Sequence, residues 1–368
     1  SKMKKLKIGF IGCGGIAFDK HLPGMATQTD KIDMYAFCDI IAERAEEARQ
    51  KYGCTDAKMY TDYHELLEDP EIYAVHVLTP NVKHCEISCA AMEAGKHVIC
   101  EKPMAATAAD AKKMLDTSKR TGKLLTIGYQ YRHFDANRAM KDYVSTGALG
   151  DIYYAETTAI RRRGIPTWGV FTNKAEQGGG PLIDIATHSL DLTLWMMNNY
   201  EVESVTGVSF AKIGKYAAPD EMGNDFGAWN PAKYEVEDSA FGFVRMKNGA
   251  LINLRCSWAL NMIAPGGSVL LCGTKGGLDN SDGVRANHVV ANRQVDSKIA
   301  TRAPRFMPSN LIDRNPMVMP NVAEAEIWVN ALLGKGGLFV TAEQAYTVTR
   351  ILDAIYQSSA TGKTVYFD

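Results

Sequence analysis

Residues 7–17 read KIGFIGCGGIA, a short apolar run that leads into a GxGxxA motif and then into a helix-forming stretch. Gly12 permits a tight turn after the strand, Gly14 lets the backbone approach a pyrophosphate, and Ala17 is small enough for helix–strand packing. A helix that begins here would present its first N–H groups to a phosphate. Glycine-rich turns also occur without any ligand, so the residues further along must decide the meaning of this one.

The second apolar run of the chain ends in Phe37-Cys38-Asp39, about 20 residues beyond the glycine motif. A carboxylate in this place accepts hydrogen bonds from both ribose hydroxyls of an adenosine and repels a 2′-phosphate. No arginine follows Asp39 directly, since the next one is Arg44, and this favours NAD over NADP. Asp39 could instead cap a helix predicted over residues 41–52, and the two roles are compatible.

The first part of the chain alternates short β-rich runs with helical stretches, which indicates βαβ units and a parallel sheet. The predicted strands cover residues 7–11, 33–38, 74–78, 97–100 and 124–127. The predicted helices cover residues 17–27, 41–52, 63–68, 84–94 and 108–120. We therefore expect an α/β Rossmann domain over residues 3–128.

After about residue 130 the β-rich runs become long and amphipathic, and a hairpin turn at 246–249 indicates antiparallel pairing. The predicted strands cover residues 152–160, 204–213, 239–245, 250–258 and 268–272, and the predicted helices 183–197, 322–333 and 342–358. Two long loops are expected at 217–234 and 281–320. These features predict an α+β domain over residues 129–368 with an open, mainly antiparallel sheet.

Composition excludes several classes of protein. The 368 residues carry 41 Lys and Arg against 42 Asp and Glu, so bulk electrostatic binding to nucleic acid or to an acidic membrane is not expected. No apolar run approaches the roughly 20 residues that span a bilayer. The 8 cysteines form no CxxC motif, which is typical of reduced thiols in a cytoplasmic protein.

Two further motifs follow predicted strands, at the strand ends where open α/β sheets bind their ligands. Thr79-Pro80-Asn81 leads to His84, and Glu101-Lys102-Pro103 follows Cys100. The first motif could equally be an ordinary capped helix start, and the second a surface turn with solvated charges. A lysine at such a strand end would place a cation beside a bound cofactor.

The predicted helix over residues 183–197 follows a run of three glycines and carries Asp184 and His188. Positions four apart share one face of a helix, so these two side chains would form one wall of a site. A histidine in this place could also be a packing residue. A metal site is not favoured, because no third ligand occurs at a suitable spacing.

The GxGxxA motif, the strand-end Asp39, TPNxxH, EKP and the D-x-x-x-H helix occur here in an order that resembles the Gfo/Idh/MocA oxidoreductase family. That family is named for glucose–fructose oxidoreductase and inositol dehydrogenase, and the resemblance covers nearly the whole chain apart from the long loops. It implies hydride transfer to NAD from a secondary hydroxyl of a sugar, glycoside or cyclic polyol. A pyranose or glycoside is the favoured substrate, with C3 as one expected position.

The resemblance also implies residue roles. His188 would be the general base, Lys102 would stabilise the developing alkoxide, and Asp184 would bind a second hydroxyl. The predicted cofactor-binding residues are Gly12, Gly14, Gly15, Ile16, Asp39, Thr79, Pro80, Asn81, His84, Glu101, Lys102, Gln130 and Trp168. The predicted substrate residues are Lys102, Arg132, Arg163, Asp184 and His188, and no metal is expected.

Other functions stay open at this point. Relatives of this kind include enzymes that use NAD transiently to cleave or rearrange a glycosidic bond, inositol dehydrogenases, and enzymes that reduce imines or biliverdin. A nucleotide-binding sensor without turnover is least favoured, because Lys102, Asp184 and His188 are all present. The expected assembly is a homodimer or homotetramer in the cytoplasm, without nucleic-acid or membrane partners.

Overall fold

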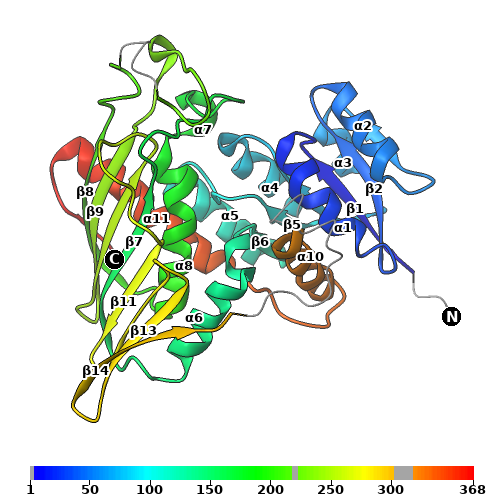
Figure 1. The fold of residues 1–368 in the computed structure, drawn as a ribbon. Helices are drawn as coiled ribbons and strands as arrows, with labels where there is room; N and C mark the ends of the chain where they lie inside the picture. The colour runs from blue at the N-terminus through cyan, green and yellow to red at the C-terminus, as the bar shows by residue number, and fades with distance from the viewer. Residues whose placement is uncertain (1–3, 218–222, 302–317) are drawn as a thin grey trace. The chain divides into compact units, whose positions relative to one another are not determined.

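The computed structural model describes residues 4–217, 223–301 and 318–368, and these form two compact units (Figure 1). Among the described residues, unit 1 consists of 4–105, 109–134 and 318–346, and unit 2 of 106–108, 135–217, 223–301 and 347–368. Each unit is therefore discontinuous in sequence. The sequence instead suggests two consecutive domains that divide at residue 128.

Unit 1 contains a six-stranded sheet in the order β3-β2-β1-β4-β5-β6, with every described pair parallel. The strands are β1 (Leu6–Ile11), β2 (Ile32–Cys38), β3 (Lys58–Tyr60), β4 (Ile72–Val77), β5 (His97–Cys100) and β6 (Leu125–Ile127). The central strands are buried almost throughout, as expected when helices cover both faces of a parallel sheet. The predicted Rossmann architecture is confirmed.

The helices of unit 1 connect these strands. They are η1 (Ala17–His21), α1 (Leu22–Ala26), α2 (Ala42–Tyr52), α3 (Tyr63–Glu68), η2 (Asn81–Lys83), α4 (His84–Glu93), α5 (Ala108–Thr121), η3 (Gln130–His133) and α10 (Val318–Leu332). Helix α10 comes from the C-terminal part of the chain, and its Trp328 and Val329 pack into the same core as Phe10 and Met25. It therefore completes the core of the N-terminal sheet.

Unit 2 contains a nine-stranded sheet in the order β14-β13-β12-β11-β7-β10-β9-β8-β15. Strands β7 and β10 pair in parallel, and the other described pairs are antiparallel. The strands are β7 (Ile152–Ile160), β8 (Val202–Phe210), β9 (Ser239–Met246), β10 (Leu251–Ser257), β11 (Val269–Gly273), β12 (Gly277–Asp279), β13 (Val284–Val290), β14 (Arg293–Ile299) and β15 (Val365–Tyr366). The remaining elements are α6 (Asp135–Ser145), α7 (Lys174–Gln177), η4 (Leu182–Ala186), α8 (Thr187–Met197), η5 (Pro231–Lys233) and α11 (Ala342–Thr361).

The two faces of this sheet differ. On one face α11 packs so closely that a Cβ atom at Gly207 or Gly242 would approach Ile355 within 3.0 Å. On the other face, Phe243 is paired across the sheet with Thr206 and Asn253, and 54% of its surface is exposed. The mainly antiparallel, open sheet that the sequence predicts is thus confirmed.

One sequence prediction is wrong. The long loop expected at 281–320 contains the hairpin of β13 and β14, with Ala291 and Asn292 at positive φ in its turn. Most of β14 is exposed, so it lacks the alternation of apolar and polar residues that reveals a half-buried strand. Residues 302–317 of that predicted loop, and 218–222 of the loop predicted at 217–234, lie outside the described residues.

Candidate active site

The turn after β1 is built for a close approach of backbone. Gly12 has φ of +98°, and its N–H donates to the carbonyl of Cys38 at 2.8 Å. A Cβ atom at Gly12 would lie 2.6 Å from the carbonyl oxygen of Leu78, so only glycine fits. At Gly14 a Cβ atom would meet nothing within 4 Å, and at Gly15 its nearest neighbour would be 3.9 Å away. The turn therefore leaves open space where a pyrophosphate would lie, next to Ile16 at the start of η1.

Asp39 holds this turn in place. Its Oδ2 accepts from the N–H of Cys13 at 2.8 Å, and its Oδ1 accepts from the N–H of Ile41 at 2.8 Å. Helix α2 begins at Ala42 without a side-chain cap, so Asp39 is not its N-cap residue. Each carboxylate oxygen has a second lone pair, which leaves Asp39 able to accept from ribose hydroxyls as well.

The turn after β4 carries Thr79, Pro80 and Asn81. The Oγ1 atom of Thr79 is buried and has no hydrogen-bond partner among the described residues. Pro80 is exposed, and Asn81 begins the short helix η2. An exposed turn with an unsatisfied hydroxyl fits a polar ligand at this strand end.

His84 joins this turn to the next one. Its Nδ1 lies 2.7 Å from the carbonyl oxygen of Pro103 and its Nε2 lies 2.9 Å from that of Thr79. Burial lowers the pKa of His84 and outweighs the opposing effect of the two carbonyls. A neutral imidazole has one N–H, so it donates to one carbonyl at a time. The ring is buried, and these contacts make His84 a link between the turns that follow β4 and β5.

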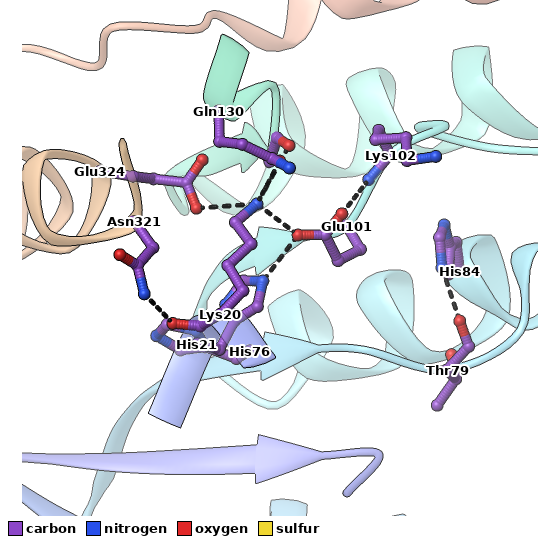
Figure 2. Close-up of polar contacts among 11 residues, drawn as sticks. Lys20, His21, His76, Thr79, His84, Glu101, Lys102, Gln130, Asn321 and Glu324 are labelled. Atoms are coloured by element: carbon purple, nitrogen blue, oxygen red, sulfur yellow. Dashed lines mark hydrogen bonds and ion pairs between the residues drawn. The ribbon is translucent and has the colours of Figure 1, made fainter. Parts of the chain in front are cut away.

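Glu101 is the centre of a buried polar network beneath Lys102 (Figure 2). Its Oε1 accepts from Lys20 Nζ at 2.5 Å and lies 2.7 Å from His21 Nε2, and its Oε2 accepts from the backbone N–H of Lys102 at 3.1 Å. Lys20 also contacts Glu324 at 3.1 Å. The carboxylate of Glu101 thus fixes the backbone of the Lys102 turn from inside the unit.

Charge pairing governs this network. Burial acts to raise the pKa of Glu101, but Lys20 and His21 outweigh it and hold the pKa well below its usual range. Burial acts to lower the pKa of Lys20, and Glu101 together with Glu324 reverses this. His21, Glu101 and Glu324 are close enough to share a metal ion, but the ammonium of Lys20 already supplies the cation between the two carboxylates.

Gln130 and Arg132 lie in the interior of unit 1. Gln130 accepts from Lys20 at 2.7 Å, and Arg132 donates to the carbonyl of Phe339 and to Gln344, each at 2.9 Å. Arg132 is fully buried. These contacts favour a structural role for Arg132 inside unit 1 over the substrate contact that the resemblance implies.

Asp184 and His188 belong to unit 2. Asp184 lies in the π-helical turn η4 and His188 in α8, which continues from it. The Oδ2 atom of Asp184 accepts from Nε1 of Trp258 at 3.2 Å, and His188 is largely buried. π-helical turns within helices often occur at functional sites, because the inserted residue redirects side chains.

Glu237 and Tyr356 hold the start of this helix, and the sequence motifs do not reveal them. Glu237 accepts from the N–H groups of Gly180 and Leu182 at 2.9 and 3.1 Å, and from the hydroxyl of Tyr356 at 2.6 Å. Burial raises the pKa of Glu237, against the effect of these donors. A Cβ atom at Gly179 would clash with the Tyr356 hydroxyl, and one at Gly180 with the Glu237 backbone, so the glycine run serves this close packing.

Arg163 and Trp168 lie in the loop after β7. Arg163 donates to Asn261 at 2.7 Å. Trp168 is exposed and contacts Phe171 and Phe226 edge-on, with ring centroids 5.7 and 4.9 Å away. The loop therefore carries a cation, Arg163, and an exposed aromatic ring, Trp168, that packs against Phe171 and Phe226.

The predicted site residues thus form two sets. Unit 1 brings together the glycine turn, Asp39, the turn at 79–84 and Lys102 at the carboxyl ends of neighbouring strands. Unit 2 carries Arg163, Trp168, Asp184 and His188.

Comparison with known proteins identifies both parts of the chain. The family model described as "Oxidoreductase family, NAD-binding Rossmann fold" (Gfo/Idh/MocA) matches residues 6–129, and its partner model, "Oxidoreductase family, C-terminal alpha/beta domain", matches residues 141–367. The chain is 35% identical to D-glucoside 3-dehydrogenase of Escherichia coli (strain K12) over 361 residues, 98% of this chain and 97% of that protein. It is 30% identical to levoglucosan dehydrogenase of Pseudarthrobacter phenanthrenivorans over 273 residues, 68% of this chain and 66% of that protein.

Solved structures share the fold. A levoglucosan dehydrogenase in complex with NADH superposes with a TM-score of 0.82, at 24% identity and 99% coverage of both chains. An aldose-aldose oxidoreductase from Caulobacter crescentus superposes with a TM-score of 0.76, at 23% identity, over 99% of this chain and 100% of that chain.

Proposed function

The chain belongs to the Gfo/Idh/MocA oxidoreductase family, and from this premise we propose that it oxidises a secondary hydroxyl of a pyranoside, with C3 as the position attacked. The observation that carries this proposal is the similarity to a D-glucoside 3-dehydrogenase over 98% of the chain, with Lys102, Asp184 and His188 all present.

The residues of unit 1 fit the adenine half of a dinucleotide. The open space beside Gly14 and Gly15 leaves room for a pyrophosphate next to the first N–H groups of η1. Asp39 retains lone pairs for ribose hydroxyls, and Thr79 offers a hydroxyl that has no partner among the described residues. Bound NAD would supply the acceptor for the hydride that leaves the substrate carbon.

The side chains of this protein would then manage the proton and the charge. As the carbon loses hydride, the hydroxyl proton passes to the imidazole of His188 as general base. The ammonium of Lys102 donates to the same oxygen and stabilises its negative charge. Asp184, oriented by Trp258, accepts from a neighbouring hydroxyl of the ring and so fixes which carbon faces the cofactor.

The test is NAD reduction with methyl glucosides, free glucose and myo-inositol, followed by NMR analysis of the ketone position. We expect stoichiometric NADH and a 3-keto glycoside. NADH formation from inositol alone would assign the protein to the inositol dehydrogenases. Cleavage of the glycoside without net NADH would indicate a redox-neutral cycle instead.

Assembly and location are also part of the proposal. The open face of the unit 2 sheet exposes Phe243, Phe210 and Val208, and we assign this face to contact with a second copy in a homodimer or homotetramer. Among the described residues, no helix is both long and apolar enough to cross a membrane. The eight cysteines form no disulfide, and a cytoplasmic location accords with their being free.

A further inference from the structure

A small cavity lies behind the Glu101 network, inside unit 1. Its volume is about 10 Å³, and its polar lining comes from His76 on β4, from Lys20 and His21 on η1, and from Asn321, Glu324 and Trp328 on α10. Glu324 is already paired with Lys20. Three of the residues that line it each have a buried polar atom without a hydrogen-bond partner among the described residues, namely Nε2 of His76, Oδ1 of Asn321 and Nε1 of Trp328. Three such atoms on the residues around one cavity call for an explanation, since a buried polar group without a hydrogen-bond partner destabilises the folded protein.

The chemistry of the three atoms restricts the ligand. The indole Nε1 of Trp328 is only a donor. The Oδ1 of Asn321 is an acceptor, and its assignment is secure because Nδ2 donates to the carbonyl of Lys20 at 2.8 Å. A ligand must therefore accept and donate at once, which excludes metal cations and ammonium. The volume is close to the minimum for one water molecule and too small for an alcohol.

His76 leaves the same requirement in either tautomer. Glu101 is ionised, so Nε2 of His21 carries the proton that lies between them. Nδ1 of His21 lies 2.8 Å from Nδ1 of His76, and one of the two must donate to the other. Burial, with a smaller effect of the neighbouring His21 and Lys20, lowers the pKa of His76 well below its ordinary value, so its ring carries a single proton. If Nδ1 of His76 donates, its Nε2 has no proton and must accept a hydrogen bond. If Nδ1 accepts, Nε2 is protonated and must donate one. A ligand that can both donate and accept a hydrogen bond satisfies Nε2 in either tautomer.

We propose that one water molecule is bound in this cavity by Trp328, Asn321 and His76. It completes a continuous hydrogen-bonded chain from α10 through His76 and His21 to Glu101, and Glu101 holds the backbone of Lys102 (Figure 2). Three hydrogen bonds are the usual number for a buried water. His76 and His21 are then positioning residues for the turn that carries Lys102.

The direct test is a crystal structure of the full chain at a resolution that shows ordered water. We expect one peak within hydrogen-bond distance of all three atoms. An empty cavity would overturn the proposal, as would side chains rearranged so that the three atoms pair with protein groups.

A solution test uses two buried tryptophans as a matched pair. The indole N–H of Trp328 should show a cross-peak to a long-lived water in a water-selective NOE experiment. The indole N–H of Trp229 donates to the carbonyl of Gly214 at 2.7 Å and should show none. A missing cross-peak at Trp328, with both resonances observed, would count against the water.

A functional arm rests on the proposed role of Lys102. His76→Phe keeps a ring against Phe10 but removes both nitrogens, whereas His76→Gln can still donate and accept. We expect His76→Phe to lower kcat at least several-fold with little change in the KM for NAD, and His76→Gln to recover part of the loss. Equal kcat in His76→Phe and the parent would remove His76 as a positioning residue. If no sugar is turned over by the parent, the density and NOE tests still decide the water site.

Discussion

At the scale of single residues, Lys102 and His188 carry different parts of the proposed reaction, so their variants should fail differently. Lys102→Ala removes the cation that stabilises the alkoxide, and kcat should fall by several orders of magnitude. His188→Ala removes the general base, and kcat should fall roughly 10²–10⁴-fold. Raising the pH should partly restore the histidine variant, because hydroxide can replace the base, but not the lysine variant. Steady-state kinetics against pH measures both, and near-parental turnover by His188→Ala would show that His188 is a packing residue.

Asp39 should determine the choice of cofactor. A 2′-phosphate placed beside its carboxylate would cost several kcal/mol, so NAD should bind much more tightly than NADP. Asp39→Asn removes the charge but keeps an oxygen that can accept from the N–H of Cys13 or Ile41. The variant should therefore show a smaller difference in affinity between NAD and NADP. Titration of both cofactors measures this, and Asp33→Asn, on the strand β2 that precedes Asp39, is the control. Equal binding of NAD and NADP by the parent would contradict the assignment.

Substitution of Glu237 should weaken binding of the sugar substrate without changing the affinity for NAD. The carboxylate of Glu237 accepts hydrogen bonds from three donors. In Glu237→Gln the side-chain NH2 group would face one of these donors, so the free energy of unfolding should fall by about 1–3 kcal/mol. The helix start that places Asp184 should loosen, and the KM for the sugar should rise while NAD affinity stays unchanged. Tyr356→Phe removes a single donor and should have the smaller effect. Loss of NAD affinity in Glu237→Gln would contradict this division of roles.

These residues also show what sequence reasoning can reach. Lys102, Asp184 and His188 are found because family motifs surround them. Glu237 and His21 have no such motif, and they become visible only when the fold brings Glu237 to Gly180 and His21 to Glu101. Long-range contacts of this kind leave no local periodicity in the chain.

At the scale of elements, His97 on β5 should make unit 1 less stable in acid. Burial, assisted by Lys123, lowers the pKa of His97 to about 4, and its Nδ1 accepts from the N–H of Leu124 at 3.0 Å. The unfolded chain binds a proton at an ordinary pKa of ~6.5, so the free energy of unfolding should fall as the pH drops from there toward 4. Because the ring is only half-buried, we expect a loss of the order of 1 kcal/mol.

Urea denaturation at several pH values measures this dependence. His97→Gln should remove it, leaving only the pH dependence that comes from the other titratable groups. An identical pH dependence in His97→Gln and the parent would refute the role of His97.

Elements with a strong pattern are predictable and others are not. The predicted helix at 63–68 and strands at 97–100 and 152–160 coincide with α3, β5 and β7, because apolar periodicity marks them. Strand β14 escapes prediction because solvent reaches most of it, and β3 because three residues carry no period. The Gly12 turn is predictable to the residue, since a φ of +98° requires glycine there.

At the scale of the whole molecule, the open face of the unit 2 sheet leads to a prediction about assembly. Val208, Phe241 and Phe243 lie side by side across β8 and β9, and the ion pair of Arg255 with Glu156 at 3.3 Å lies on the same face. A large apolar patch exposed to water on a folded protein commonly marks a protein–protein contact. Burial against a second copy would remove that apolar surface from water.

Phe243→Arg should therefore dissociate the assembly by placing a charge in the contact. Light scattering at micromolar concentration should give a mass near a multiple of 40.4 kDa for the parent and 40.4 kDa for the variant. Met59→Arg, at a partly exposed apolar position on β3 of unit 1, is the matched control and should keep the parental mass. A parent that scatters as a single chain would refute the assembly, and an assembled Phe243→Arg would move the contact to another surface.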